Sequence, residues 1–161
     1  ADAAGADDAL RDGLGSDRNA GLDLLHSTRV APGFATEKLT VVRHFPAHPA
    51  ALARLCPDDR NVADRVEVFF GNLELANGYV ELTDPIEQRN RMTADLDRRR
   101  VTRQPGVPVD KYLLGALEHG LPECAGVALG FERLLMIASG KDDIRDVVTF
   151  AYEDPHGADD D

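Results

Sequence analysis

The sequence has no tryptophan and only two cysteines, and it lacks the features of several common protein classes. Cys56 and Cys124 form neither a C-x-x-C pair nor a disulfide framework, so we expect a reducing compartment, the cytoplasm. The longest apolar run, residues 125–131, contains two glycines and is far shorter than the about 20 residues that cross a bilayer. We therefore expect no membrane partner.

Basic residues are too few for a broad nucleic-acid-binding surface, which needs a basic face. The 161 residues carry a net charge of −11, and most of it lies at the ends. Residues 1–23 carry −4 and residues 153–161 carry −5. We predict that residues 1–23 form an acidic, poorly ordered segment and 153–161 an acidic tail, around one domain at residues 24–152.

The pattern within that domain predicts an α+β fold, an antiparallel sheet flanked by helices. Residues 65–70 and 73–82 have strand-like composition and are joined by Gly71–Asn72, a two-residue link that requires antiparallel pairing. Asp84, Pro85 and Glu87 supply the start of a helix that runs to about Arg103. The remaining expected elements are a strand at 39–43, a helical piece at 50–55, helices at 110–119 and 131–138, a buried strand at 126–130 and an extended segment at 144–152.

The hairpin carries acidic side chains where a plain strand would be apolar. With Gly71–Asn72 as the turn, Glu67 is expected opposite Ala76, with Glu74 as its diagonal neighbour. Diagonal neighbours lie about 7–8 Å apart, a gap that two carboxylates can close around one cation. Oxygen ligands of this kind suit Mg²⁺. Taken alone, the three glutamates fit a solvated sheet face better than a metal site.

Glu81 has the opposite parity to Glu74 along the second strand. A β-bulge near residues 76–78 would bring Asn77, Tyr79 and Glu81 onto the ligand face. A carboxylate beside an aromatic ring there could receive a primary ammonium.

Residues 126–133 read GVALGFER. The glycines would let a flat ring lie against the strand, and Arg133, in the first turn of the next helix, suits a phosphate. Taken singly, the glycines also fit close packing and Arg133 a surface ion pair. His44, His48 and His119 lack metal-ligand spacing, and Cys56 and Cys124 are interpreted as core or incidental residues.

Residues 74–84 (ELANGYVELTD) and 126–134 (GVALGFERL) resemble the lysyl branch of the class II aminoacyl-tRNA synthetases, the second stretch resembling motif 3 of that class. Within this branch, HFPA at 44–47 and CAGVALG at 124–130 are similar to the bacterial elongation factor P lysine ligases. The resemblance implies part of a class II catalytic domain. It also implies ATP- and Mg²⁺-dependent activation of lysine or (R)-β-lysine as an acyl-adenylate, followed by transfer to a lysine of elongation factor P. A homodimer is implied for the full-length protein.

The resemblance assigns roles at the nucleotide. Glu67 and Glu74 would hold Mg²⁺, and Glu74 would also bind ATP with the backbone at Leu75. Gly130 would approach ATP, and Arg133, the catalytic residue, would contact the terminal phosphate.

The resemblance also assigns an amino-acid pocket. Glu81 would bind the terminal ammonium of the substrate, with Asn77 and Tyr79 lining the pocket. Ala128 stands where lysyl-tRNA synthetases usually have glycine, and the extra methyl favours the elongation factor P ligases. One methyl group is worth about 1–3 kcal/mol of discrimination between substrates.

Motifs 1 and 2 of the class are not found, so the chain looks like the C-terminal half of a catalytic domain. Two other interpretations stay open. One is a lysyl-tRNA synthetase core that charges tRNA, and the other is a non-catalytic remnant.

Overall fold

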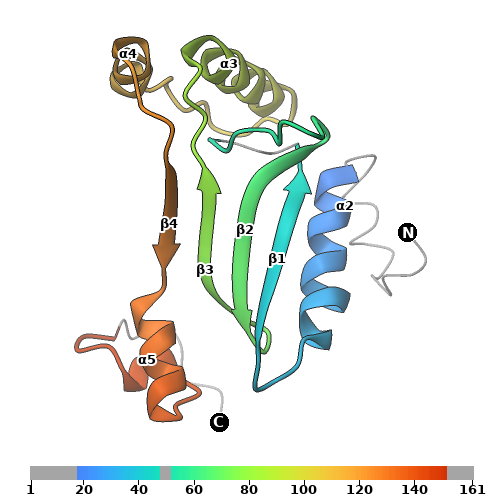
Figure 1. Ribbon diagram of the computed structural model, residues 1–161, viewed down its shortest axis with the longest axis vertical. Coiled ribbons are helices and arrows are strands. Elements are labelled where there is room, and N and C mark those ends of the chain that lie inside the picture. Colours follow the sequence, from blue (N-terminus) through green and yellow to red (C-terminus); the bar gives the residue numbers. More distant parts are fainter. Residues whose placement is uncertain (1–17, 48–51, 152–161) are drawn as a thin grey trace.

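A four-stranded antiparallel sheet forms the centre of the computed structural model, with its strands side by side in sequence order (Figure 1). The structure describes residues 18–47 and 52–151. The strands are β1 (Leu39–Pro46), β2 (Val62–Phe70), β3 (Leu73–Val80) and β4 (Ala125–Leu129). With its flanking helices, this sheet confirms the α+β prediction.

The turn between β2 and β3 lies at Gly71–Asn72, as the sequence predicts. Gly71 has a φ of 57°, and a Cβ there would lie 3.3 Å from the carbonyl oxygen of Thr36. Glycine suits the position because it adopts left-handed backbone angles without a steric penalty.

The helices lie around the sheet rather than within it. In Figure 1, α2 (Arg18–Leu25) lies beside β1, α3 (Pro85–Val101) and α4 (Lys111–His119) lie beyond one end of the sheet, and α5 (Phe131–Ser139) lies beyond the other. The π-helical turn η2 (His26–Val30) and the 3₁₀ turn η3 (Ala31–Gly33) continue α2. In the described part of the chain, no helix has the length and apolar character needed to cross a membrane.

Local capping explains where the helices begin and end. The Asp84 carboxylate accepts hydrogen bonds from the backbone of Ile86 and Glu87 at the start of α3. Asp110 caps α4 in the same way, and Gly140, with a φ of 65°, ends α5. These caps satisfy backbone groups that a helix leaves unpaired at its termini.

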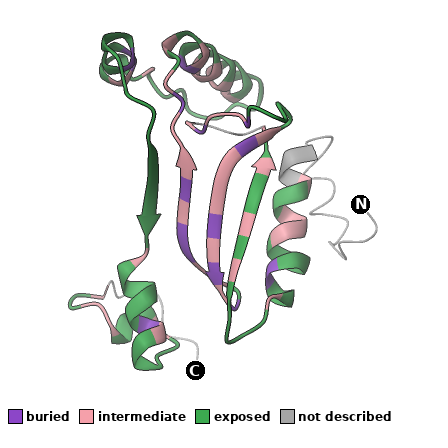
Figure 2. Ribbon diagram, viewed as in Figure 1, coloured by how far each residue is buried: buried purple, intermediate pink, exposed green. Residues whose placement is uncertain are grey.

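The buried side chains are few, and β2 and β3 carry the largest group of them (Figure 2). Ala53 and Ala63 are completely buried, and Leu55 and Tyr79 pack against them. Leu114 and Leu117 anchor α4, with exposed fractions of 2% and 5%.

Three predicted elements differ in the structure. A helical piece is expected at 50–55, of which residues 50 and 51 lie outside the described part. The rest is not helical, because Ala53 forms a β-bridge with Glu81 and Leu55 forms one with Ala63. The expected buried strand is β4, and all five of its residues are exposed, because among the described residues it pairs only with β3. In the expected extended segment, residues 144–146 form the 3₁₀ turn η4 (Ile144–Asp146), which the Asp143 side chain caps.

The acidic segment at 1–23 and the acidic tail at 153–161 stay predictions. The acidic tail and most of the acidic segment at 1–23 lie outside the described residues, and α2 begins at Arg18.

Candidate active site

The β2–β3 hairpin contains a bulge that sets the position of its acidic side chains. Glu67 pairs with Asn77 and Phe69 pairs with Glu74, so Leu75 is the extra residue on β3. The expected pairing of Glu67 with Ala76 is therefore wrong, because the expected register allowed no extra residue between them and the turn. The bulge adjoins the place predicted for it, and it turns the β3 side chains that follow.

The bulge brings the two carboxylates of Glu67 and Glu74 to one amide. Asn77 Nδ2 donates hydrogen bonds to Glu67 Oε1 at 3.2 Å and to Glu74 Oε1 at 3.4 Å. Because both oxygens lie within reach of one nitrogen atom, they converge on one small region. The two predicted metal ligands are thus neighbours.

Glu67 is a buried carboxylate, with only 8% of the residue exposed. Burial raises the pKa of Glu67, because loss of contact with water disfavours the ionised form of the carboxyl group. The neighbouring guanidinium of Arg65 opposes that shift. The Arg65 Nη2 donates to Glu67 Oε1 at 2.6 Å.

Arg65 is a functional candidate that sequence reasoning missed. Its Nε donates to Asn77 Oδ1 at 3.2 Å, and its guanidinium lies 4.6 Å from the centre of the Phe45 ring. Arg65 therefore orients Glu67 and Asn77 together. The spacing of Arg65 and Glu67, two positions apart on one strand, could have indicated that their side chains lie on the same face. The contact of Arg65 with Phe45 of β1 could not be predicted from the sequence.

Arg133 reaches the hairpin from the first turn of α5. Its Nη1 donates to the backbone oxygen of Glu74 at 2.8 Å and lies 3.9 Å from Glu74 Oε2. The Gly130 amide donates to the Leu75 carbonyl at 2.9 Å, and a Cβ on Gly130 would lie 3.2 Å from Arg133 Cδ. The structure thus brings together all the residues expected at the nucleotide.

A cavity of about 380 Å³ opens beside these groups and is lined by Glu67, Glu74 and Arg133. His26 of η2 also lines it, and the imidazole lies 5.6 Å from the Phe69 ring, centre to centre. The buried His26 Nε2 has no hydrogen-bond partner among the described residues. Sequence reasoning missed His26, because its place depends on how the helix before β1 packs.

The side chains expected in the amino-acid pocket follow along β3. Asn77 pairs with Ala128 and Tyr79 pairs with Gly126 of β4. Burial raises the pKa of the Tyr79 hydroxyl, and the charge of nearby Glu81 adds to that shift. A Cβ on Gly126 would lie only 2.8 Å from Glu81 Oε1, so the absent side chain leaves room for the carboxylate.

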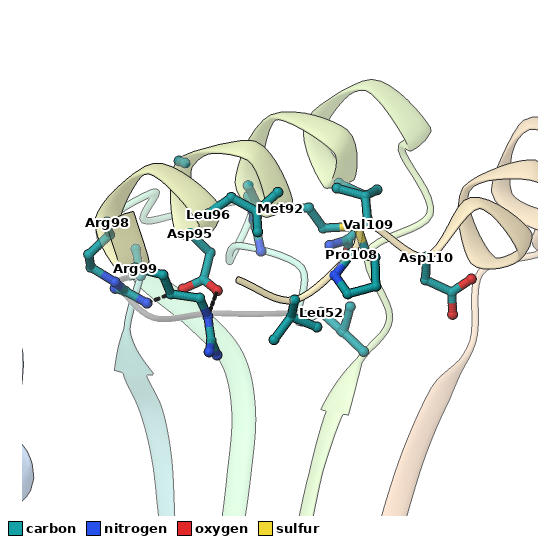
Figure 3. Close-up of a pocket in the computed structure, with 14 residues that line it drawn as sticks. Leu52, Met92, Asp95, Leu96, Arg98, Arg99, Pro108, Val109 and Asp110 are labelled. Carbon is teal, nitrogen blue, oxygen red and sulfur yellow. Dashed lines mark hydrogen bonds and ion pairs between the residues drawn. The ribbon is translucent and has the colours of Figure 1, made fainter. Parts of the chain in front are cut away.

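A second cavity, of about 610 Å³, lies elsewhere. It is bordered by α3 and residues 107–110 (Figure 3) and includes none of the predicted site residues. At its edge, Asp95 forms ion pairs with both Arg98 and Arg99.

A family model described as tRNA synthetases class II (D, K and N) matches residues 28–154. The chain belongs to this class II tRNA synthetase family. Membership confirms the resemblance derived from residues 74–84 and 126–134, and it agrees with the antiparallel sheet and flanking helices.

Class II relatives with curated names point to one branch. The chain is 47% identical over 135 residues to an elongation factor P–(R)-β-lysine ligase of Photorhabdus laumondii, a match that covers 84% of this chain and 42% of that relative. Proteins of the same name match from Pectobacterium carotovorum (46% identity, 85% of this chain, 42% of the relative) and Pseudoalteromonas translucida (47%, 80%, 40%). The chain spans about 40–42% of the length of these relatives.

Proposed function

We propose that the protein to which this chain belongs is a ligase that activates a lysine-type amino acid with ATP and transfers it to a lysine of elongation factor P. The observation that carries the proposal is the convergence of Glu67, Glu74 and Arg133 on one cavity. The names of the relatives supply the amino acid and the acceptor.

The donor set fits Mg²⁺, which prefers carboxylate oxygens and keeps part of its shell for water and phosphate. Glu67 and Glu74 would hold the ion, since one Oε1 of each faces the same nitrogen of Asn77. A bound Mg²⁺ would neutralise phosphate charge. Arg65 holds Glu67 in place for that role through its 2.6 Å hydrogen bond.

Arg133 would bind the phosphates of ATP beside these carboxylates. Its side chain is 45% exposed, and one of its nitrogens is fixed on the Glu74 carbonyl. The guanidinium is therefore oriented before a ligand arrives, and its other nitrogens, which make no hydrogen bond within residues 18–47 and 52–151, are available for a phosphate oxygen. Leu75 and Gly130, joined by a backbone hydrogen bond, would form the surface against the nucleotide.

The substrate ammonium would pair with Glu81, beside Tyr79 and Asn77. The substrate carboxylate then attacks the α-phosphorus of ATP, pyrophosphate leaves, and an acyl-adenylate forms. A lysine amine of elongation factor P attacks its carbonyl carbon and releases AMP. The residues of this chain bind and orient the reactants, and positioning with electrostatic stabilisation supplies most of the rate. A translation factor as acceptor implies a cytoplasmic enzyme, and a homodimer is part of the proposal.

A tRNA acceptor is the second candidate, because the family model describes tRNA synthetases. Ala128 and the relatives' names favour the protein acceptor. The test is pyrophosphate exchange by the complete protein with lysine and (R)-β-lysine, followed by parallel incubation with elongation factor P and with tRNA. Labelling of elongation factor P alone supports the proposal. Charging of tRNA, or no exchange with either amino acid, contradicts it, and the latter would favour a non-catalytic remnant.

A further inference from the structure

Three chemically different metal-binding side chains meet away from the proposed ATP site. They are His44 of β1, Cys56 of the segment before β2, and Asp64 of β2. One ligand atom of each residue lies within 4.8 Å of the others. None of the three lines the 380 Å³ cavity or contacts Glu74 or Arg133 through a hydrogen bond in the described part of the chain. Of the three, His44 is exposed, Cys56 is buried and Asp64 is partly buried.

Strand pairing brings these residues together. In the β1–β2 register, Arg43 pairs with Val66 and Phe45 with Ala63, so His44 lies opposite the β2 residues Asp64 and Arg65. This register shift is a β-bulge, with two residues opposite one. The bridge between Leu55 and Ala63 then brings the neighbouring Cys56 to the same end of β2.

The backbone of His44 is unusual. Its φ is 61°, and among the described residues other than glycine only Arg103 shares a positive φ. Such conformations are uncommon outside glycine and cluster at functional sites. A hydrogen bond between Cys56 and Asp64 alone would need neither the imidazole nor this conformation.

The Asp64 carboxylate is oriented before any ion binds. Its Oδ2 accepts a hydrogen bond of 2.8 Å from Arg54 Nη2, while its Oδ1 accepts one of 3.3 Å from the Cys56 thiol. Metal-binding carboxylates are usually oriented by a further hydrogen-bond donor, and Arg54 is that donor for Asp64. The oxygen that faces Cys56 is the one available to a metal.

We propose that His44, Cys56 and Asp64 form a binding site for a zinc-class divalent cation, separate from the Mg²⁺ site. Nitrogen, sulfur and oxygen donors in this combination suit Zn²⁺, whereas Mg²⁺ takes oxygen ligands. Binding replaces the thiol proton, which leaves to solvent, with the metal ion. Three protein ligands leave a fourth position for water. The ion would tie β1 to the start of β2.

Cobalt absorption tests the site directly, because a Co²⁺–thiolate bond gives a charge-transfer band that oxygen and nitrogen ligands alone do not. Apo protein is titrated with Co²⁺ in the presence of excess Mg²⁺, and Zn²⁺ is then added. We expect one equivalent of Co²⁺ to give the band and Zn²⁺ to remove it. Absence of the band in the unmodified protein overturns the proposal.

Matched variants assign the ligands. Cys56→Ser should abolish the band, and His44→Asn should weaken binding at least tenfold. Asparagine tolerates the positive φ of His44, so this exposed variant keeps the fold. Cys124→Ser and His119→Asn, at an exposed cysteine and an exposed histidine, should bind as the unmodified protein does. A band that survives Cys56→Ser, or that is lost in Cys124→Ser, contradicts the proposal. Since pyrophosphate exchange is not the readout, failure here leaves the proposed function unaffected.

Discussion

Arg133 and Glu74 lie 59 positions apart in the sequence, and a hydrogen bond of 2.8 Å joins the guanidinium of the first to the backbone oxygen of the second. The bond links α5 to the β2–β3 hairpin through main chain rather than through the Glu74 carboxylate alone. The position of Arg133 therefore does not depend on whether the carboxylate of Glu74 binds an ion.

Arg133→Ala should impair adenylate formation and leave the fold intact. The side chain is 45% exposed, so little packing is lost, but a cation beside the phosphates is removed. Loss of one such group costs roughly 10²–10³ in rate. Pyrophosphate exchange by the complete protein measures the effect, with Arg89→Ala, at another exposed arginine, as the control. Equal activity in the two variants would contradict the role, as would unfolding of Arg133→Ala.

Glu81→Gln should remove the preference for a substrate that carries a side-chain ammonium. The change keeps the shape of the side chain and removes its charge. Loss of one partner from a buried charge pair costs about 2–5 kcal/mol, so the apparent affinity should fall at least about 30-fold. Exchange assays at varied amino-acid concentration give the KM. An unchanged KM for (R)-β-lysine would refute the assignment of Glu81.

Two glycine variants separate pocket effects from folding effects. In Gly126→Ala, the new methyl would lie 2.8 Å from Glu81 Oε1, the end of a flexible side chain that can move. In Gly78→Ala, the methyl would lie 2.7 Å from the Gly126 carbonyl oxygen, which is main chain of the β3–β4 pair. We expect the first to raise the KM for the amino acid and the second to lower the midpoint of unfolding. The reverse pattern, measured by exchange assays and urea denaturation, would contradict this geometry.

Ala128→Gly tests the discrimination between lysine isomers. Ala128 pairs with Asn77 across β3 and β4, so its methyl lies beside the proposed pocket. Removal of one methyl should change the ratio of kcat/KM values for (R)-β-lysine and lysine by roughly 10–200-fold. A ratio that does not move would show that the isomer is selected elsewhere in the protein.

The Asp143 carboxylate should stay ionised below pH 3.8, where an ordinary aspartate takes up its proton. Hydrogen bonds from the Arg145 side chain and backbone lower its pKa to about 2 from the ordinary value of 3.8. Because the folded pKa is depressed, the stability that the ionised form contributes is complete above pH 3.8 and is lost as the pH falls to about 2. A carbon-13 NMR titration gives the pKa directly, and Arg145→Ala should raise it. Titration of Asp143 near 3.8 in the unmodified protein would contradict the geometry.

Short-range signals account for the parts of the fold that the sequence predicted well. The Gly71–Asn72 turn and the Asp84 cap depend on residues within a few positions of one another, so composition and spacing identify them. The exposure of β4 could not be predicted in this way. Its apolar composition matches a buried strand, and burial depends on what packs against both of its faces.

The candidate site likewise combines residues that local motifs identify with residues that depend on long-range contacts. Glu67, Glu74 and Arg133 could be named from motifs, but the bulge at Leu75 that joins them depends on pairing across the sheet. Arg65, His26 and the grouping of His44 with Asp64 depend on contacts between segments distant in sequence. The spacing of residues along one strand does not predict those contacts.

Paramagnetic broadening by Mn²⁺ tests most directly whether the hairpin binds a metal–nucleotide complex. The complete protein, labelled with nitrogen-15 asparagine, receives Mn²⁺ and ATP in place of Mg²⁺ and ATP. We predict that the side-chain amide of Asn77, which bridges Glu67 and Glu74, broadens first. The amides of Asn61 and Asn90 should remain sharp at the same concentration. A sharp Asn77 signal at saturating Mn²⁺ and ATP would contradict a metal–nucleotide site at Glu67 and Glu74.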